Sequence, residues 1–428
     1  MLTRPHRQVA ATLALALFTI APTVWVSRTV HALGRPGHVR EVEIEIGHRL
    51  GVLAHIAAAT HPRPDVDILS EVSLRQDDAS NGQIARADAI RVVRSNGEMT
   101  LRVGHLVLTG EGASDAIGRV VTLMRRLASS GESHISLVAD RCDVTLNGRI
   151  ETLRDLAAIV QLDHASPSLT ASYLIAEEGA RERTRCELAI ACEAPGTTRV
   201  AIKTMDGSVP ARVLSPFVEA DAWFGRSARL DGAITLARLD GMCWEAEFRG
   251  DISGVDLSSV VGRRFAGHRL TGVAKLAIES ARWGERPGGQ GPGWVGARGV
   301  LTAGPGSISA SLLDAMSSRM RFRLALPIES GRPDVDYQGL GLAFSMTSDG
   351  ELALRGALGG EYAPDAVLVQ NHRASPLARA PQGAANVRGL WNTLIPATPE
   401  NLAPAVPEMH VLRSLPLPPG VAGKLSTN

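Results

Sequence analysis

The sequence predicts a mainly β protein with a few helices, in which an N-terminal transmembrane helix is followed by a long antiparallel sheet. Apolar and polar residues alternate with a period of two from Leu230 to Trp283, as they do in a strand with one buried face. Seven Asn-Gly or Asp-Gly pairs, which favour tight hairpin turns, recur along the chain. A charge-free run from Val9 to Val26 precedes all of these strands.

The N-terminal segment predicts a single membrane anchor. Arg4 and Arg7 are followed by 18 residues without a charge. As a helix these residues span ~27 Å, slightly less than the ~30 Å hydrocarbon core, and flanking residues make up the difference. The basic N-terminus predicts that residues 1–8 are cytoplasmic, that residues 9–30 cross the membrane, and that the body lies on the far side. A cleavable signal peptide that ends before Leu33 is the alternative.

The first strands of the body are predicted directly after the anchor, and the body extends over residues 39–358. Val42, Ile44 and Ile46 alternate with glutamates, which predicts a strand. Further on, a hairpin is predicted around Asn96-Gly97, with a slip of the alternation near Gly104 where a bulge is plausible. The regular spacing of such turns predicts a long antiparallel meander.

Three helices are expected to interrupt the strands, near residues 115–130, 152–162 and 309–319. In the first, Ser114 is a suitable N-cap and Gly131 a suitable end, and the apolar residues between them form one stripe. The second is predicted from the spacing of Leu153, Leu156 and Val160.

The C-terminal segment differs in composition. Residues 359–428 hold 10 of the 24 prolines, few aromatic residues and no sustained periodicity. Such a composition does not support a packed core. We therefore expect a proline-rich tail that is largely disordered, with a short helix or docking segment possible over residues 386–394.

The stretch from Leu230 to Trp283 contains the candidate functional residues. Turn pairs at Asp231-Gly232 and Asp240-Gly241 enclose one predicted strand, and two more strands follow. Charged residues lie on one side of these strands, so the predicted sheet has a polar and an apolar face. The candidates on the apolar side are Ile234, Leu236, Trp244, Phe248, Leu276 and Ile278.

Composition and motifs exclude several classes of function. A net charge of +1 and 4% aromatic residues argue against nucleic acid as a partner. The sequence contains no P-loop, zinc-protease, nucleophile-elbow or calcium-loop pattern, so no catalytic residue and no cofactor is predicted. The twelve histidines are dispersed, which predicts no metal site. Cys186 and Cys192 lie too far apart in one strand to bridge each other, and a bridge to Cys142 stays open.

Two segments resemble bacterial AsmA-like proteins. They are Arg229 to Val261, with Arg-Leu-Asp-Gly-Ala-Ile-Thr-Leu followed by Phe-Arg-Gly-Asp-Ile-Ser-Gly-Val-Asp-Leu, and Gly299 to Gly306. The resemblance implies a single-pass protein of the inner (cytoplasmic) membrane whose periplasmic body is a curled β-groove. It implies that the apolar face binds or moves phospholipid or another lipid, or supports outer-membrane assembly with other envelope proteins. The chain is shorter than the long lipid-bridging members.

Two other classes of function remain compatible with the sequence. The same alternation would line the closed core of a structural or scaffolding β protein of the envelope that carries no lipid. An enzyme is the third class, and it would require polar residues from several strands to converge in a pocket. The degree to which the apolar face is covered distinguishes the first two classes.

Overall fold

The computed structural model describes most of the chain between Pro36 and Leu394. Within that range it leaves out residues 64, 77–81, 96–97, 111–112, 129–132, 147–148, 164, 176–183, 194–195, 215–222, 240–241, 243, 263–264, 266, 287–290, 326–332 and 371–375. The predicted anchor at residues 9–30 and the signal-peptide alternative lie outside the described residues. None of the helices that are described is long and apolar enough to cross a membrane.

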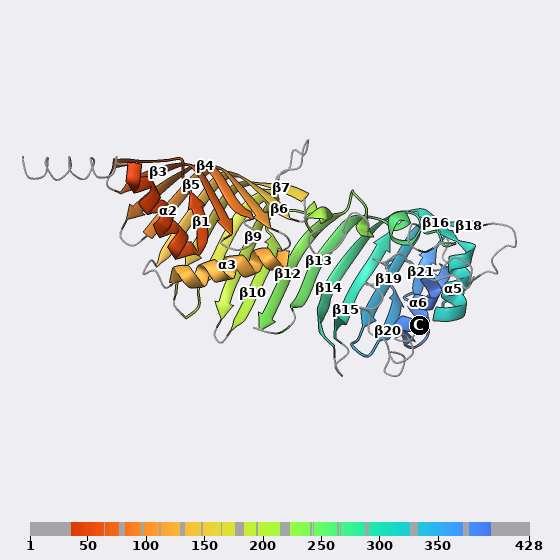
Figure 1. Cartoon of the computed structure of the whole chain (residues 1–428). Coiled ribbons are helices and arrows are strands. Elements are labelled where there is room, and N and C mark those ends of the chain that lie inside the picture. The colour runs from red at the N-terminus through yellow and green to blue at the C-terminus, as the bar shows by residue number, and fades with distance from the viewer. Residues whose placement is uncertain are drawn as a thin grey trace, which may run out of the picture. The chain divides into compact units, whose positions relative to one another are not determined.

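The protein is mainly β, as the sequence predicts. In the part of the chain that is described, 21 strands are assigned to a long, mostly antiparallel sheet, and β16 and β18 form a second, two-stranded sheet (Figure 1). The chain divides into two compact units, residues 1–174 and residues 175–428, which we describe separately.

Unit 1 is a sheet with two helices. β1 and β2 both pair with β3, and the sheet then continues through β4, β5, β6 and β7. β5 and β6 are parallel because α3 crosses between them, so the predicted antiparallel meander is interrupted here. The elements are α2 Pro36–Leu50, β1 Val52–His55, β2 Ala58–Arg63, β3 Val66–Gln76, β4 Gln83–Ser95, β5 Glu98–Gly110, α3 Ala113–Ala128, β6 His134–Leu146, β7 Arg149–Gln161 and, at the division, β8 Ser168–Ile175.

The segment predicted as the first strand is helix α2 instead. Val39, Val42 and Ile46 pack together on the core cluster that contains Ile56. Their spacing of three and four residues is that of one helix face, whereas Ile44 is 64% exposed. The alternation with glutamate is therefore incidental, and the period-two interpretation was wrong here.

The helix predicted over residues 152–162 is also wrong, because this segment is strand β7. It pairs with β6 along its whole length. Asp155 has a positive φ of 48°, which bends the strand and shifts the side-chain alternation by one residue. Leu153 and Leu156 consequently have the three-residue spacing of a helix although they lie in a strand. By contrast, α3 occupies the segment predicted as a helix near 115–130, with Val121 and Met124 buried.

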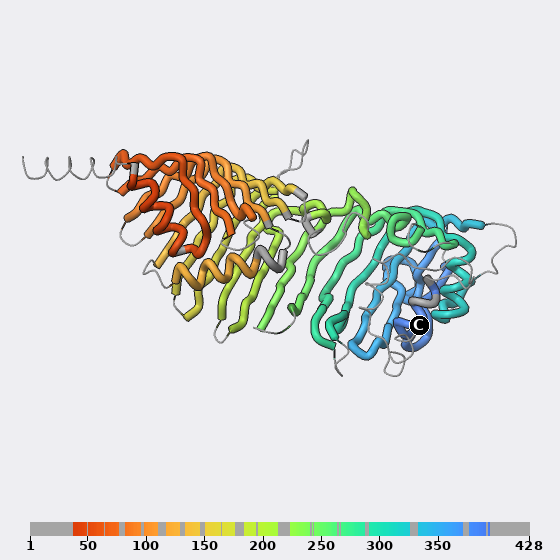
Figure 2. The backbone as a smooth tube through the Cα atoms, viewed as in Figure 1, coloured from red at the N-terminus to blue at the C-terminus, as the bar shows by residue number. Residues whose placement is uncertain are grey.

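Unit 2 continues the β architecture. Its strands run in the order β9, β10, β12, β13, β14, β15, β19 and β20, each antiparallel to the next (Figure 2). Shorter strands and two helices complete its C-terminal end. The elements are β9 Thr184–Glu193, β10 Thr197–Thr204, β11 Val209–Pro210, η1 Ala211–Leu214, β12 Arg229–Leu239, β13 Glu245–Asp256, η2 Ser258–Gly262, β14 Val273–Glu285, β15 Pro292–Ala303, β16 Gly306–Ser309, α5 Ala310–Met320, β17 Arg323–Leu324, β18 Asp334–Tyr337, β19 Gly339–Met346, β20 Glu351–Gly356, β21 Ala366–Val369, β22 Pro376–Arg379, β23 Ala385–Asn386 and α6 Val387–Leu394.

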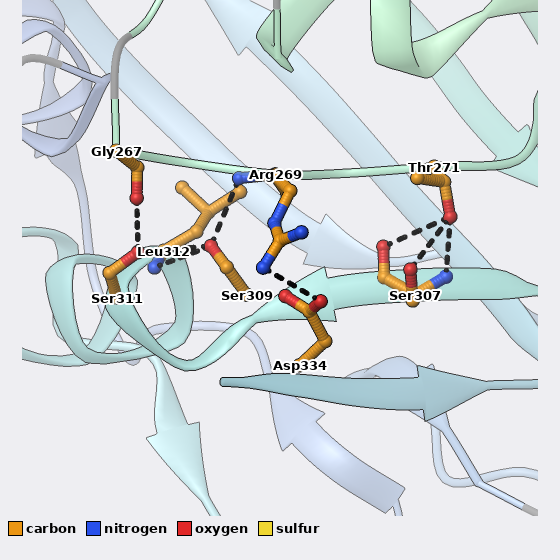
Figure 3. A network of polar contacts seen from close by, with 8 residues as sticks. All are labelled: Gly267, Arg269, Thr271, Ser307, Ser309, Ser311, Leu312 and Asp334. Carbon is orange, nitrogen blue, oxygen red and sulfur yellow. Dashed lines mark hydrogen bonds and ion pairs between the residues drawn. The ribbon is translucent and has the colours of Figure 1, made fainter. Parts of the chain in front are cut away.

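Hydrogen bonds fasten the segment before β14 to β16 and to α5, the helix predicted near 309–319 (Figure 3). The Ser309 hydroxyl is the N-cap of α5, where it accepts from the backbone amide of Leu312 at 3.3 Å. The same hydroxyl accepts from the backbone amide of Arg269 at 3.0 Å. The Ser307 amide donates to the Thr271 hydroxyl at 2.8 Å. These bonds hold the entry to β14, and therefore its register, in place.

The prediction that residues 359–428 form a largely disordered tail is wrong for the described residues between 359 and 385, whereas the short helix expected over residues 386–394 is confirmed by α6. β21 pairs with β19 and β22, and β23 pairs with β20. All four residues of β21 are at most 2% exposed, and Val387 in α6 is completely buried. A short strand that is buried on both faces shows no alternation, so the sequence pattern could not reveal it. Residues 395–428 lie outside the described range.

Candidate functional site

The central feature of unit 2 is one continuous apolar face on its sheet, which we call the apolar face. Residues paired directly across antiparallel strands project to the same side, so the registers assign its members. They are Leu188, Ile190, Val200, Ile202, Leu230, Ile234, Leu236, Ala246, Phe248, Ile252, Leu276, Ile278, Ala281, Trp283, Trp294, Ala297, Leu301, Leu342, Phe344, Met346, Leu352 and Leu354.

Five of the six candidates from the sequence belong to this face. Ile234 pairs with Phe248, and Ile278 and Leu276 pair with the residues two and four positions farther along β13, respectively. Leu236 lies two residues from Ile234 on β12. The sixth candidate, Trp244, lies one residue before β13, so no strand pairing assigns it to the apolar face. Its ring lies under the Arg238 guanidinium, 5.7 Å from the Arg238 Cζ.

Burial differs between the middle and the ends of the apolar face. On β9 and β10, Ile190 and Val200 are 3% and 1% exposed. In the middle, Ile234, Phe248 and Ile278 are only half-buried. Within unit 2, α5 and α6 pack on each other and on β16, β17 and β23, at its C-terminal end (Figure 1). Large apolar side chains over β12 to β19 thus remain partly accessible.

The opposite face of the same strands is polar. Ion pairs join Arg249 to Glu247 at 2.7 Å and Lys275 to Asp251 at 2.5 Å. These pairs are exposed, so each contributes little to stability. Because charged side chains are costly to bury, these ion pairs keep this face of the sheet in contact with water. The opposite face is therefore the one available for apolar contacts.

Glycines set the close approach of strands at the centre of the face. Gly232 and Gly250 are paired, and a Cβ on Gly250 would lie 2.2 Å from the backbone oxygen of Asp231. Gly250 also has a φ of 143°, which other residues rarely adopt. Ile278 pairs with Gly250 on one side and with Gly299 on the other. Its two cross-strand neighbours therefore have no side chains.

Several members of the apolar face were not selected from the sequence. Leu301, Phe344 and Met346 lie on β15 and β19 and complete the face toward β20. Residues 340–346 alternate in the sequence, which predicts this strand. Its membership in the same face depends on the pairing of β15 with β19 across the α5 insertion, which alternation does not specify.

The strongest polar cluster lies in unit 1, around Asp143. The Asp143 carboxylate accepts from Arg141 at 3.1 Å, from the Thr152 hydroxyl at 2.7 Å, and bonds to the His105 ring at 2.9 Å. The hydrogen bond from Arg141 is the largest cause that lowers the pKa of Asp143 to about 2. Burial raises the pKa of the neighbouring Cys142 thiol to about 12. The Asp143 carboxylate therefore stays ionised and the Cys142 thiol stays protonated near neutral pH, and the Asp143 bonds tie β5, β6 and β7 together.

Comparisons with known protein families, with curated proteins and with solved structures give no match. Among the residues described, no three His, Cys, Asp or Glu side chains converge as metal ligands would. Cys142 and Cys186 are buried free thiols, and Cys192 is buried too. What the arrangement offers chemically is therefore an amphipathic sheet with a wide, partly accessible apolar face.

Proposed function

We propose that this protein is a membrane-anchored envelope protein whose apolar face binds lipid or helps to move it. The observation that carries the proposal is the half-buried, uncharged centre of that face over β12 to β19. At ~25 cal/mol per Å² of apolar surface removed from water, acyl chains laid on such a face gain several kcal/mol.

The resemblance to AsmA-like proteins supports the same proposal. In those proteins a curled groove carries lipid or assists assembly of the outer membrane, and the charge-free run at Val9 to Val26 would serve as the anchor in the inner membrane. The body would then lie in the periplasm. Phospholipid is the cargo we favour, with other envelope proteins as partners.

Lipid carried by the purified full chain tests this proposal. After detergent removal, bound lipid is extracted and identified by mass spectrometry. We expect lipid on the unmodified chain, a several-fold loss in Phe248→Asp, and no loss in Thr235→Asp, whose residue lies on the opposite face of β12. Circular dichroism confirms that each variant is folded. A chain without lipid would support the closed scaffold instead.

A further inference from the structure

The hairpin between β12 and β13 exposes large apolar side chains at its tip. Leu239 is 50% exposed and Met242 is 54% exposed, and the Met242 amide donates to the Leu239 carbonyl at 2.9 Å. Single exposed apolar residues are common on protein surfaces. Leu239 and Met242, however, lie near a group of tryptophans and an arginine at the same end of the strands.

Tryptophans gather at the same edge of the apolar face. Trp283 pairs with Trp294, and their rings meet edge to face with centroids 5.6 Å apart. Trp283 also pairs with Ala246, two residues from Trp244. Three of the six tryptophans of the chain therefore lie close together in sequence register here, two on β14 and β15 and one directly before β13, and all three are half-buried. Indole rings prefer the boundary between water and hydrocarbon, because one end is apolar and the N–H is polar.

Arg238 supplies a cation at this edge. It lies on the apolar face by its pairing with the buried Thr198, and its guanidinium lies over the Trp244 ring. Among the described residues it forms no ion pair. Glu285, an exposed acid at the end of β14, lies farther out than Trp283. A guanidinium in contact with an indole ring suits a phosphate oxygen, because its planar N–H groups match the geometry of the phosphate.

The two ends of these strands differ in burial. At the end away from the hairpin, Leu230, Ile252 and Ala274 are 4%, 3% and 2% exposed. At the hairpin end the tryptophans are half-buried and the apolar tip is open. An amphiphile can therefore reach the apolar face most easily from the hairpin end.

We propose that this edge, formed by Arg238, Leu239, Met242, Trp244, Trp283 and Trp294, docks on the surface of a phospholipid bilayer. The inference rests on the proposed lipid-binding function and identifies where lipid would enter. Leu239 and Met242 insert among the acyl chains, the indoles lie at the level of the headgroups, and Arg238 binds a lipid phosphate. The charge of Arg238 complements a lipid phosphate and an acidic peptide alike, but continuity with the apolar face selects the bilayer, because an acidic peptide would leave Leu239 and Met242 in water.

Vesicle flotation of the full chain, kept soluble in amphipol, tests the docking. The vesicles contain phosphatidylethanolamine and phosphatidylglycerol at a ratio of 7 to 3. We expect Met242→Glu to weaken binding about tenfold, because it removes apolar contact and adds a charge that the bilayer repels. Ile150→Glu, at a site in β7 that is 67% exposed, is the matched control and should change binding less than twofold.

A second pair of variants tests the phosphate contact. Arg238→Gln should weaken vesicle binding about fivefold, the effect of one basic residue at a membrane surface. Arg282→Gln, on the opposite face beside Trp283, should not. On vesicles of a digalactosyl lipid, which has no phosphate, Arg238→Gln should have no effect. Binding that is indifferent to both Met242→Glu and Arg238→Gln overturns the docking.

The same samples separate this inference from the proposed function. If the chain retains lipid by mass spectrometry but vesicle binding ignores the hairpin variants, only the docking site is wrong. If vesicles bind through the hairpin but no lipid is retained, docking stands and the lipid-carrying function fails. If neither is observed, both are overturned.

Discussion

Replacing Ile278 with arginine should leave unit 2 folded, whereas the same replacement at Leu236 should unfold it. Both residues belong to the apolar face, but their surroundings differ. Leu236 is 9% exposed and pairs with Val200, which is 1% exposed. Ile278 is half-buried and pairs with Gly250, so a longer side chain has no cross-strand side chain beside it there, whereas the Phe344 ring lies close to its other neighbour, Gly299.

The magnitudes separate the two variants. Leu236→Arg loses ~2 kcal/mol of burial and leaves an unpaired charge without water, which costs several kcal/mol more. Together these losses approach the whole stability of a domain, ~5 to 15 kcal/mol. Ile278→Arg loses part of one burial, ~1 to 2 kcal/mol, because the guanidinium can reach water along its flexible stem.

Thermal unfolding followed by circular dichroism measures the difference. Ile278→Arg should lower the melting temperature by about 2 to 8 °C. Leu236→Arg should give little folded protein. If Ile278→Arg unfolds the protein as thoroughly as Leu236→Arg, the centre of the apolar face is covered and the account is wrong.

Three further predictions concern the fold. Gly250→Ala should destabilise unit 2 by about 2 kcal/mol or more in urea unfolding, because the added Cβ meets a backbone oxygen at 2.2 Å and the φ is 143°. Gly104→Ala is the control: no atom lies within 4 Å of the added Cβ, so this variant should be neutral or slightly stabilising. The depressed pKa of Asp143 stabilises the folded state above pH ~4, and this stabilisation is lost as the pH falls through about 2. Asp143→Asn should therefore lower the free energy of unfolding by up to ~2 kcal/mol at neutral pH and make it less dependent on pH between ~4 and about 2. A variant whose free energy of unfolding falls with acid as the unmodified protein's does would contradict this. Deleting residues 362–428 should make the protein insoluble because it removes buried β21, whereas deleting residues 395–428 should not; equal solubility of the two truncations would show that β21 is dispensable.

Strict alternation predicted the centre of unit 2 because local sequence determines which side each residue takes. From Ile234 to Ile278, the side of each residue follows from its parity within a strand and from the turns between strands. The same alternation rule gave wrong secondary structure in two segments, for identifiable reasons. In α2, glutamates alternate with apolar residues on a helix, and in β7 the bend at Asp155 produces helix-like spacing.

Tertiary pairing was the part that sequence could not supply. β19 joins β15 only after the α5 insertion, so the extent of the apolar face depends on contacts between residues about 40 positions apart. The four buried residues of β21 give no alternation because both faces are covered. The hairpin edge likewise depends on register, which places Trp283 beside Ala246.

Site-specific photocrosslinking of the full chain in living cells tests the central claim most directly. A photoreactive phenylalanine analogue is placed at Phe248, on the apolar face, and at Glu247, its neighbour on the polar face. If the apolar face binds lipid, lipid adducts form at Phe248 and none form at Glu247. Crosslinks from Phe248 only to other segments of the same chain would show a closed core and contradict it.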